Sequence, residues 1–255
     1  MTSLFPSARR LGRLLLAPTV LAAVPGGTAG QRPITPEDLW AMGRVGAPAV
    51  SPDGSRVVYT VTRYDLESDR GHTDLWLVPT EGGEPRRLTH AEASSSSPAW
   101  SPDGRWIAFV SARNEDGRQV WLLPAAGGEP RRLTALEGGA AGPVWSADGS
   151  RLAVTGEVWA EDDPLGARMR ALADTDASAR IYDELMYRHW DAWEDGRRSH
   201  VFVVDPATGE ARDRTPGPYD TPPIGLGGFQ DYDLSPDGGE LAFVRNTDVP
   251  TAVGT

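Results

Sequence analysis

A short tetrapeptide, Ser-Pro-Asp-Gly, recurs along the chain and constrains its fold more than any other feature. It occupies positions 51–54, 101–104 and 235–238, and the variant Ser-Ala-Asp-Gly occupies 146–149. Between the serines at 51, 101, 146 and 235 the intervals are 50, 45 and 89 residues, the last being nearly two periods. Repetition at such a period predicts that the chain is built from similar supersecondary units.

A second element keeps the same period. The octamer Gly-Gly-Glu-Pro-Arg-Arg-Leu-Thr at 82–89 is repeated letter for letter at 127–134, which is 45 residues later, and a diverged copy lies at 208–215. Two independent motifs that recur in phase indicate a true structural repeat.

Each unit is interpreted as four antiparallel strands. Ser-Pro-Asp-Gly is typical of a type I turn, because Pro presets φ at its second position and Gly suits its last. An apolar strand precedes each turn, and segments rich in β-branched and aromatic residues follow it. The expected second strands are 56–62, 106–111, 152–155 and 241–245, and the expected third strands are 74–78, 119–123 and 200–204. Short edge strands would end at Leu88-Thr89 and Leu133-Thr134.

Four strands in about 45 residues is the blade period of a β-propeller. We therefore predict an all-β fold of four-stranded antiparallel blades with a partly helical insertion in the third. The expected blades are 45–90, 91–135, 136–216 with its insertion at 156–199, and an incomplete fourth at 226–255. These amount to about three and a half blades of residues 31–255, whereas propellers close with about four to eight. We expect the chain to be part of a larger ring.

Tryptophans recur at equivalent places in the units. Trp76 matches Trp121, and Trp100 matches Trp145. Periodic aromatic residues are typical of propeller blades. We therefore predict that these four pack between blades rather than stack on a ligand.

The insertion interrupts the period with aromatic and charged residues. Its segment 163–193 is interpreted as at least one helix and a loop. Insertions in repeat proteins lie on one face, which is often the binding face. If they are exposed, the large aromatic and basic side chains of the insertion would favour binding to a ligand or partner, namely Tyr187, Arg188, Trp190 and Trp193. The alternative, that they pack the insertion onto its own blade, stays open because aromatic residues are usually buried.

The first thirty residues resemble an export signal. A basic segment containing Arg9 and Arg13 precedes an apolar run at 14–24, and small residues stand at Thr28 and Gly30 before a possible cleavage site. The run is too short to span a bilayer comfortably, so no integral membrane span is expected. We predict an exported protein, periplasmic or secreted. An uncleaved anchor, a disordered N-terminus and a twin-arginine signal remain alternatives.

Composition excludes several functions. The formal net charge is −11, which does not favour nucleic acid as a partner. No cysteine is present, so disulfides and thiolate chemistry are excluded. No G-x-S-x-G, H-E-x-x-H or phosphate-binding glycine motif occurs, so we predict no catalytic residue, cofactor or metal ligand in this chain. Acidic clusters at 161–163, 183–184 and 194–195 are interpreted as solvated charge rather than as a calcium site.

The turn followed by Trp106-Ile-Ala-Phe-Val110 resembles the repeats of TolB propellers and of prolyl oligopeptidase-family serine peptidases. Two further stretches resemble the dipeptidyl-peptidase and acylaminoacyl-peptidase branch of that family: Ile-Thr-Pro-Glu-Asp-Leu at 34–39 and the long segment 182–201. The resemblance implies a C-terminal α/β-hydrolase domain that carries Ser, Asp and His. It also implies that the propeller covers the active site and admits short peptides.

In some relatives, acidic side chains of a propeller insertion bind the free amine of the substrate. That resemblance implies substrate-binding candidates in the insertion, namely Asp183, Glu184, Arg188, Trp190 and Trp193. The leading hypothesis is the substrate-gating propeller fragment of an exported serine exopeptidase, inactive by itself. The rival is a non-enzymatic TolB-like propeller that binds an envelope protein, and a sugar-binding or scaffold propeller is a third possibility. The sequence predicts no oligomeric state.

Overall fold

The structure is a computed structural model, and it describes residues 32–160, 195–223 and 231–247. Within the insertion it describes residues 167, 171, 175, 182, 187–189 and 192–193. The chain divides into two units, 1–35 and 36–255, and all the described helices and strands belong to the second. The predicted export signal at 1–30 lies outside the described residues.

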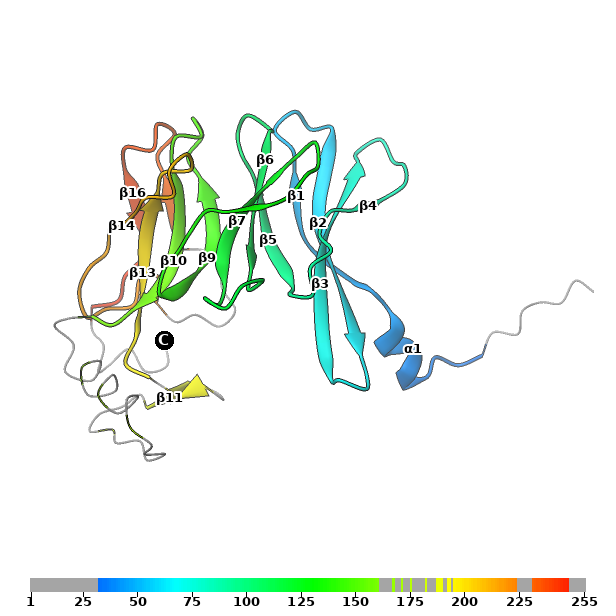
Figure 1. The fold of residues 1–255 in the computed structure, drawn as a ribbon, viewed down its shortest axis with the longest axis horizontal. Helices are drawn as coiled ribbons and strands as arrows, with labels where there is room; N and C mark the ends of the chain where they lie inside the picture. The colour runs from blue at the N-terminus through cyan, green and yellow to red at the C-terminus, as the bar shows by residue number, and fades with distance from the viewer. Residues whose placement is uncertain are drawn as a thin grey trace, which may run out of the picture. The chain divides into compact units, whose positions relative to one another are not determined.

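Among the described residues, four antiparallel blade sheets follow one another along the chain (Figure 1), and a separate two-stranded sheet lies within the insertion. The first contains β1 (Arg44–Val50), β2 (Arg56–Asp65), β3 (Arg70–Pro79) and β4 (Arg86–Arg87). The second contains β5 (Ser95–Trp100), β6 (Trp106–Ser111), β7 (Gln119–Pro124) and β8 (Arg131–Arg132). The third contains β9 (Gly138–Trp145), β10 (Leu152–Val158), β13 (Arg198–Val204) and β14 (Ala211–Asp213). In the fourth, β15 (Tyr232–Leu234) pairs with β16 (Leu241–Phe243).

The predicted fold class, an all-β propeller of four-stranded blades, is confirmed. A short helix, α1 (Pro36–Ala41), precedes β1, and proline suits its first position because the missing N–H would have no partner there. Among the helices that the structure describes, none is long and apolar enough to cross a membrane.

Each Ser-x-Asp-Gly turn is held by the same two hydrogen bonds. The Ser51 hydroxyl donates to Asp53 at 2.6 Å and accepts the N–H of Arg56 at 2.9 Å. The other three turns repeat both contacts at 2.6–2.7 Å and 2.8–3.0 Å. Gly54 adopts a φ of 71°, a left-handed conformation in which a side chain would be strained. Ser, Asp and Gly are thus each required by the turn geometry.

A bulge in each inner strand also recurs. Four residues before the turn serine, Ala47, Ser97 and Gly142 adopt φ values of 44°, 51° and 60°. The pairing of β1, β5 and β9 with the next strand shifts at these points. Sequence analysis did not find this feature, because only one of the three residues is glycine.

The bulged strands are linked from blade to blade by tryptophan. Nε1 of Trp100 donates to the carbonyl oxygen of Ala49 at 3.0 Å, and Nε1 of Trp145 donates to that of Ala99 at 3.3 Å. In the fourth sheet the hydroxyl of Tyr232 donates to the carbonyl of Gly142 instead. Trp100 and Trp145 therefore pack between blades, as predicted.

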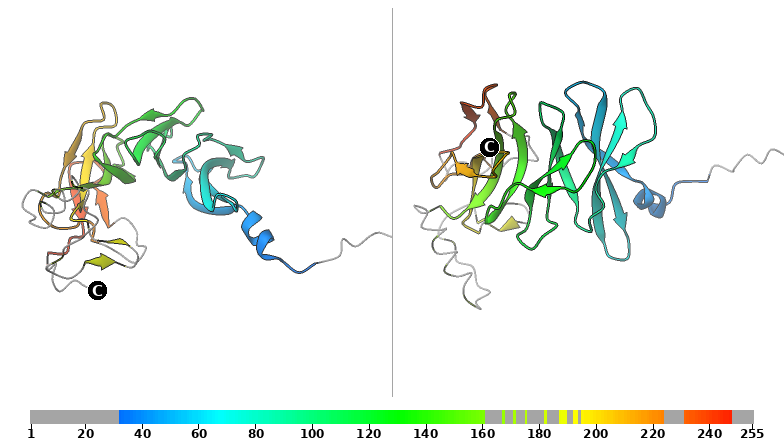
Figure 2. Two further views of the ribbon diagram at one scale, coloured as in Figure 1. Left: turned by 60° about the horizontal axis from the view of Figure 1, so that its bottom comes forward. Right: turned by 45° about the horizontal axis from the view of Figure 1, so that its top comes forward.

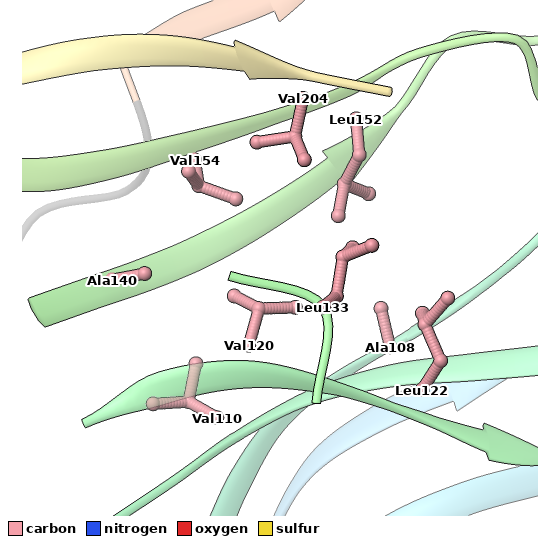
Figure 3. Close-up of a cluster of buried hydrophobic side chains, with 9 residues drawn as sticks. All are labelled: Ala108, Val110, Val120, Leu122, Leu133, Ala140, Leu152, Val154 and Val204. Atoms are coloured by element: carbon pink, nitrogen blue, oxygen red, sulfur yellow. The ribbon is translucent and has the colours of Figure 1, made fainter. Parts of the chain in front are cut away.

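Three apolar clusters fill the spaces between successive sheets. Successive residues on a strand face opposite sides, so Ile107 and Phe109 of β6 pack toward the first blade. Ala108 and Val110 pack toward the third (Figure 3). A third cluster joins the third and fourth sheets around residues Ala153, Val201, Val203, Tyr232 and Leu234. Inner strand β5 accordingly lies between β1 and β9 (Figure 2).

This arrangement gives the blades two distinct edges. One, here called the turn edge, carries the Ser-x-Asp-Gly turns, and the N–H of Asp148 there donates to the carbonyl of Pro236 at 3.0 Å. The opposite one, here called the insertion edge, carries the connections between the second and third strands of each blade. These connections are 66–69, 112–118 and 159–197. The chain therefore leaves β10 for the insertion, and returns to β13, at the edge opposite the repeated turns.

The insertion differs in part from expectation. We predicted helix and loop up to residue 193, and most of that segment lies outside the described residues. Its end forms two short paired strands, β11 (Arg188–His189) and β12 (Ala192–Trp193), with Arg188 opposite Trp193. Aromatic residues favour paired strands, which explains this local outcome. Strand β10 runs on to Val158 and β13 begins at Arg198, so the connection is slightly shorter than 156–199.

The link between blades can be tested with Trp100→Phe. The substitution keeps a buried ring but removes the N–H that Ala49 accepts, so we expect the free energy of unfolding to fall by about 1 kcal/mol. Urea denaturation followed by circular dichroism measures it. Trp40→Phe in α1 is the control, because the Trp40 indole has no carbonyl partner among the described residues. Equal effects of the two substitutions would contradict a role for the hydrogen bond.

The turn geometry makes a prediction about ionisation. Hydrogen bonds from the Ser51 hydroxyl, the Ser55 N–H and the Ser55 hydroxyl lower the pKa of Asp53 from 3.8 to about 2. Ser51→Ala removes the largest of these causes, so the pKa of Asp53 should rise toward its ordinary value. Carbon-detected NMR titration measures both carboxyls, and Asp103 in the same molecule should titrate as before. An unchanged pKa of Asp53 would contradict the assigned role of Ser51.

Candidate functional site

An aromatic cluster occupies the described part of the insertion. The ring centroids of Tyr182 and Tyr187 lie 6.1 Å and 6.0 Å from that of Trp193, with interplanar angles of 18° and 29°. The two tyrosine rings are 5.9 Å apart. The guanidinium of Arg188 lies 5.6 Å from the Trp193 ring centroid. Two predicted site residues, Arg188 and Trp193, are thus brought together.

The cluster is exposed on one side. Tyr187 and Trp193 remain 45% and 46% exposed although the rings pack on one another. Rings in this state offer a large apolar area that loses little side-chain entropy on binding, which is why such residues concentrate in binding sites. The cluster is able to receive an apolar, aromatic or prolyl side chain, while Arg188 supplies hydrogen-bond donors.

The remaining predicted site residues, Asp183, Glu184 and Trp190, lie outside the described residues. The same holds for the acidic stretch 161–163. Within the described ranges no group of three or more His, Asp or Glu side chains is arranged to hold a metal ion.

Where the insertion returns to the blade, it is anchored by an ion-pair network. Arg197 contacts Glu157 of β10 at 3.0 Å and Asp195 at 2.6 Å. Burial opposes ionisation of Asp195, but its hydrogen bonds from Arg197 prevail and lower its pKa. Asp195, which belongs to the acidic cluster 194–195, is therefore neutralised by Arg197 rather than free to bind calcium.

A buried histidine lies beside this anchor, at the start of β13. Nδ1 of His200 is 2.7 Å from the carboxylate of Asp213, and Nε2 is 2.9 Å from the carbonyl oxygen of Gly217. The carboxylate of Asp213 and the carbonyl of Gly217 lie on opposite sides of the imidazole, so each ring nitrogen of His200 contacts a different neighbouring segment. His200 thus holds the end of β14 and the chain beyond it against the root of the insertion.

This site belongs to a repeated pattern that sequence analysis missed. Thr89, Thr134 and Thr215 each accept, through the hydroxyl, the N–H of a residue in the third strand of their blade at 2.9–3.0 Å. Fifteen residues before each threonine stands a buried polar residue, namely Asp74, Gln119 and His200. In the sequence, the signal for this pattern was a polar residue that stands fifteen positions before the last threonine of each octamer copy.

The histidine pair makes the stability of the third blade depend on pH. Burial would raise the pKa of Asp213, but the hydrogen bonds from His200 and from the N–H of Thr215 outweigh it and lower that pKa. A carboxylate with a lowered folded-state pKa contributes stability above its unfolded pKa of about 3.9, and that contribution is lost as the pH falls through the folded-state value.

Asp213→Asn should therefore lower the free energy of unfolding by about 1–2 kcal/mol at pH 7, because a charged partner of a buried group is lost. The difference from the unsubstituted chain should shrink as the pH falls below about 4. Denaturation series at several pH values measure both effects. Glu210→Gln, in an exposed ion pair with Arg212, is the control and should have little effect. A pH-independent loss would contradict the ionic role of Asp213.

The chain is similar in sequence to parts of several proteins that are named as peptidases. The family described as the Tricorn protease N-terminal beta propeller domain matches residues 70–163. Dipeptidyl-peptidase 5 of Porphyromonas gingivalis is 36% identical over 223 residues, which cover 85% of this chain and 32% of that protein. Dipeptidyl-peptidase 5 of Porphyromonas endodontalis is 30% identical, covering 82% of this chain and 30% of that protein.

A solved structure shares the fold. Acylaminoacyl peptidase of Pyrococcus horikoshii superposes with a TM-score of 0.53 at 19% identity, over 71% of this chain and 27% of that one. The chain spans about a third of the length of the curated relatives that it matches.

The sheets and their packing define the chain as part of a β-propeller built from four-stranded blades. It is homologous to part of the dipeptidyl-peptidase 5 proteins, and the predicted resemblance to the propellers of dipeptidyl-peptidase and acylaminoacyl-peptidase proteins is confirmed.

Proposed function

We propose that this chain is the substrate-gating propeller of an exported serine exopeptidase of the dipeptidyl-peptidase or acylaminoacyl-peptidase type. An α/β-hydrolase domain in the rest of the protein supplies the nucleophile. The observation that carries the proposal is the 36% identity to a dipeptidyl-peptidase over 85% of this chain, which corresponds to only 32% of that relative. The present sequence contains no G-x-S-x-G elbow, so the chemistry belongs to the remainder.

The insertion edge is the side on which the peptide is handled. Its exposed rings at Tyr187 and Trp193 stack on a peptide side chain, and Arg188 donates to a peptide carbonyl. Asp183 and Glu184 bind the free amine, and Trp190 extends the apolar contact. A propeller over the active site admits short peptides because a folded protein is too wide to reach the nucleophile. The signal at 1–30 directs the protein to the periplasm or the exterior.

The proposal is tested by expressing the complete reading frame that contains this chain, beside the chain alone. The complete protein should hydrolyse dipeptidyl or acylaminoacyl p-nitroanilides and should react with a fluorophosphonate probe for serine nucleophiles. The chain alone should do neither. A complete protein that neither hydrolyses nor reacts would overturn the proposal and favour a non-enzymatic propeller that binds an envelope protein.

Trp193→Ala in the complete protein tests the role of the aromatic cluster. Loss of a stacking ring worth about 1–2 kcal/mol should raise KM about tenfold and leave kcat nearly unchanged. Steady-state kinetics on a dipeptidyl p-nitroanilide measure both constants. The matched control is Arg212→Ala, because Arg212 is an exposed residue of β14, the last strand of the third sheet, outside the insertion. A KM equal to that of the control would exclude the cluster from substrate binding.

A further inference from the structure

An arginine at the insertion edge of the second blade is held in a fixed orientation by its neighbours. The guanidinium of Arg113, in the connection between β6 and β7, lies 4.9 Å from the ring centroid of Phe109 and 5.0 Å from that of Trp121. Its Nε donates to the Ser111 hydroxyl at 3.3 Å, and its Nη2 donates to the Ser95 hydroxyl at 3.1 Å. Both serines are buried, so two rings and two hydroxyls fix the orientation of the guanidinium.

Within the described part of the chain, the charge of Arg113 has no ion-pair partner. Among the described residues no carboxylate oxygen lies within 4 Å of it, whereas Arg132 contacts Asp116 and Arg197 contacts Glu157 at the same edge. Burial lowers the pKa of Arg113, and the more distant charge of Glu129 opposes that shift. A partly buried guanidinium without a carboxylate is an arrangement that an anion would stabilise.

The donors that remain point to the kind of anion. A guanidinium has five N–H donors, of which the two serine hydroxyls engage two. Nη1 has no partner in the described part of the chain and is not among its buried unpaired atoms, so it faces solvent. The free N–H groups therefore present the planar fork that fits both oxygens of a carboxylate.

The repeat locates Arg113 at the same edge of the blades as the insertion. Arg113 follows its turn glycine, Gly104, by nine residues, and Arg63 follows Gly54 by the same interval. Arg63 also stacks on a tryptophan, at 5.6 Å from the Trp76 centroid, but it is exposed and has only this one ring. The equivalent residue of the third blade ends β10, where the insertion begins. Arg113 therefore occupies a position on the second blade that is equivalent to the position on the third blade where the insertion begins.

We propose that Arg113 binds a carboxylate of the peptide that enters at the insertion edge. This inference rests on the proposed function for the presence of a peptide, and it adds the charge that the peptide carries. The carboxylate is either the C-terminus of a short peptide or the side chain of Asp or Glu. The aromatic cluster on the insertion and Arg113 on the neighbouring blade then contact different parts of one ligand.

The test is an NMR titration of the full 255-residue chain, observing the Nε–Hε signals of arginine. The probes are Gly-Gly-Gly, its C-terminal amide, and acetyl-Gly-Glu-Gly-amide, at matched ionic strength. The Arg113 signal, assigned by its absence in Arg113→Gln, should shift with the free acid or with the glutamyl peptide, and the stronger of the two identifies the source. The peptide amide should leave it unmoved.

Substitutions sharpen the result. Arg113→Gln should weaken binding of the acid at least tenfold, and Arg113→Lys should weaken it as well, because lysine keeps the charge but lacks the fork. Arg105→Gln, an exposed arginine at the turn edge, is the matched control and should bind as the unsubstituted chain does. Arg63→Gln should have a smaller effect than Arg113→Gln.

Shifts of equal size with all three peptides, no shift with either carboxylate-bearing peptide, or unchanged binding by both Arg113 variants would overturn the inference. The comparison of peptides uses the unsubstituted chain, and Arg113→Lys also lacks the arginine Nε–Hε signal, so the assignment stands even if Arg113→Gln fails to fold. A complete protein that hydrolyses peptides, without a carboxylate-dependent shift of Arg113, would remove this inference and leave the proposed function. A carboxylate-dependent shift of the Arg113 signal, together with a complete protein that hydrolyses no peptide, would remove the proposed function and leave the carboxylate site at Arg113.

Discussion

The structure depends on apolar packing between successive sheets. Each sheet has two apolar faces, because alternate residues of strands such as β6 point to opposite sides. Ile107 and Phe109 are covered by the first blade, and Ala108 and Val110 by the third (Figure 3). A single blade cannot cover its own faces, so stability belongs to the row of blades rather than to any one of them. The same packing places every second-to-third strand connection at one edge.

Polar contacts specify how the packed sheets align. Tryptophan N–H groups bind the carbonyls of Ala49 and Ala99 in the preceding blade, each two residues after a left-handed bulge residue. Within a blade, a threonine hydroxyl binds the third strand, and a buried polar residue accompanies it. That residue is Asp74 in the first blade, paired with Arg87, and His200 in the third, paired with Asp213. The buried residue is a carboxylate in the first blade and an imidazole in the third, so the fold requires a satisfied pair there rather than one particular side chain.

The insertion edge differs chemically from the turn edge. At the turn edge, serine hydroxyls and backbone N–H groups satisfy the aspartates and lower their pKa values. At the insertion edge, exposed rings at Tyr187 and Trp193 and the unpaired guanidinium of Arg113 remain available for contact. Unsatisfied groups of this kind are expected where a protein meets a ligand. The proposed peptide function and the carboxylate inference both locate the ligand at this edge.

The sequence by itself determined the blade period, the order of strands, the turn chemistry and the role of Trp100 and Trp145, because these follow from local spacing and local φ preferences. It also named Arg188 and Trp193, whose contact the structure shows, while Asp183, Glu184 and Trp190 stay predictions. Only the tertiary structure decided the bulges at Ala47 and Ser97, the pairing of His200 with Asp213, and the position of Arg113 between two rings. These depend on strand register and on the packing of side chains far apart in the sequence, which no local pattern encodes.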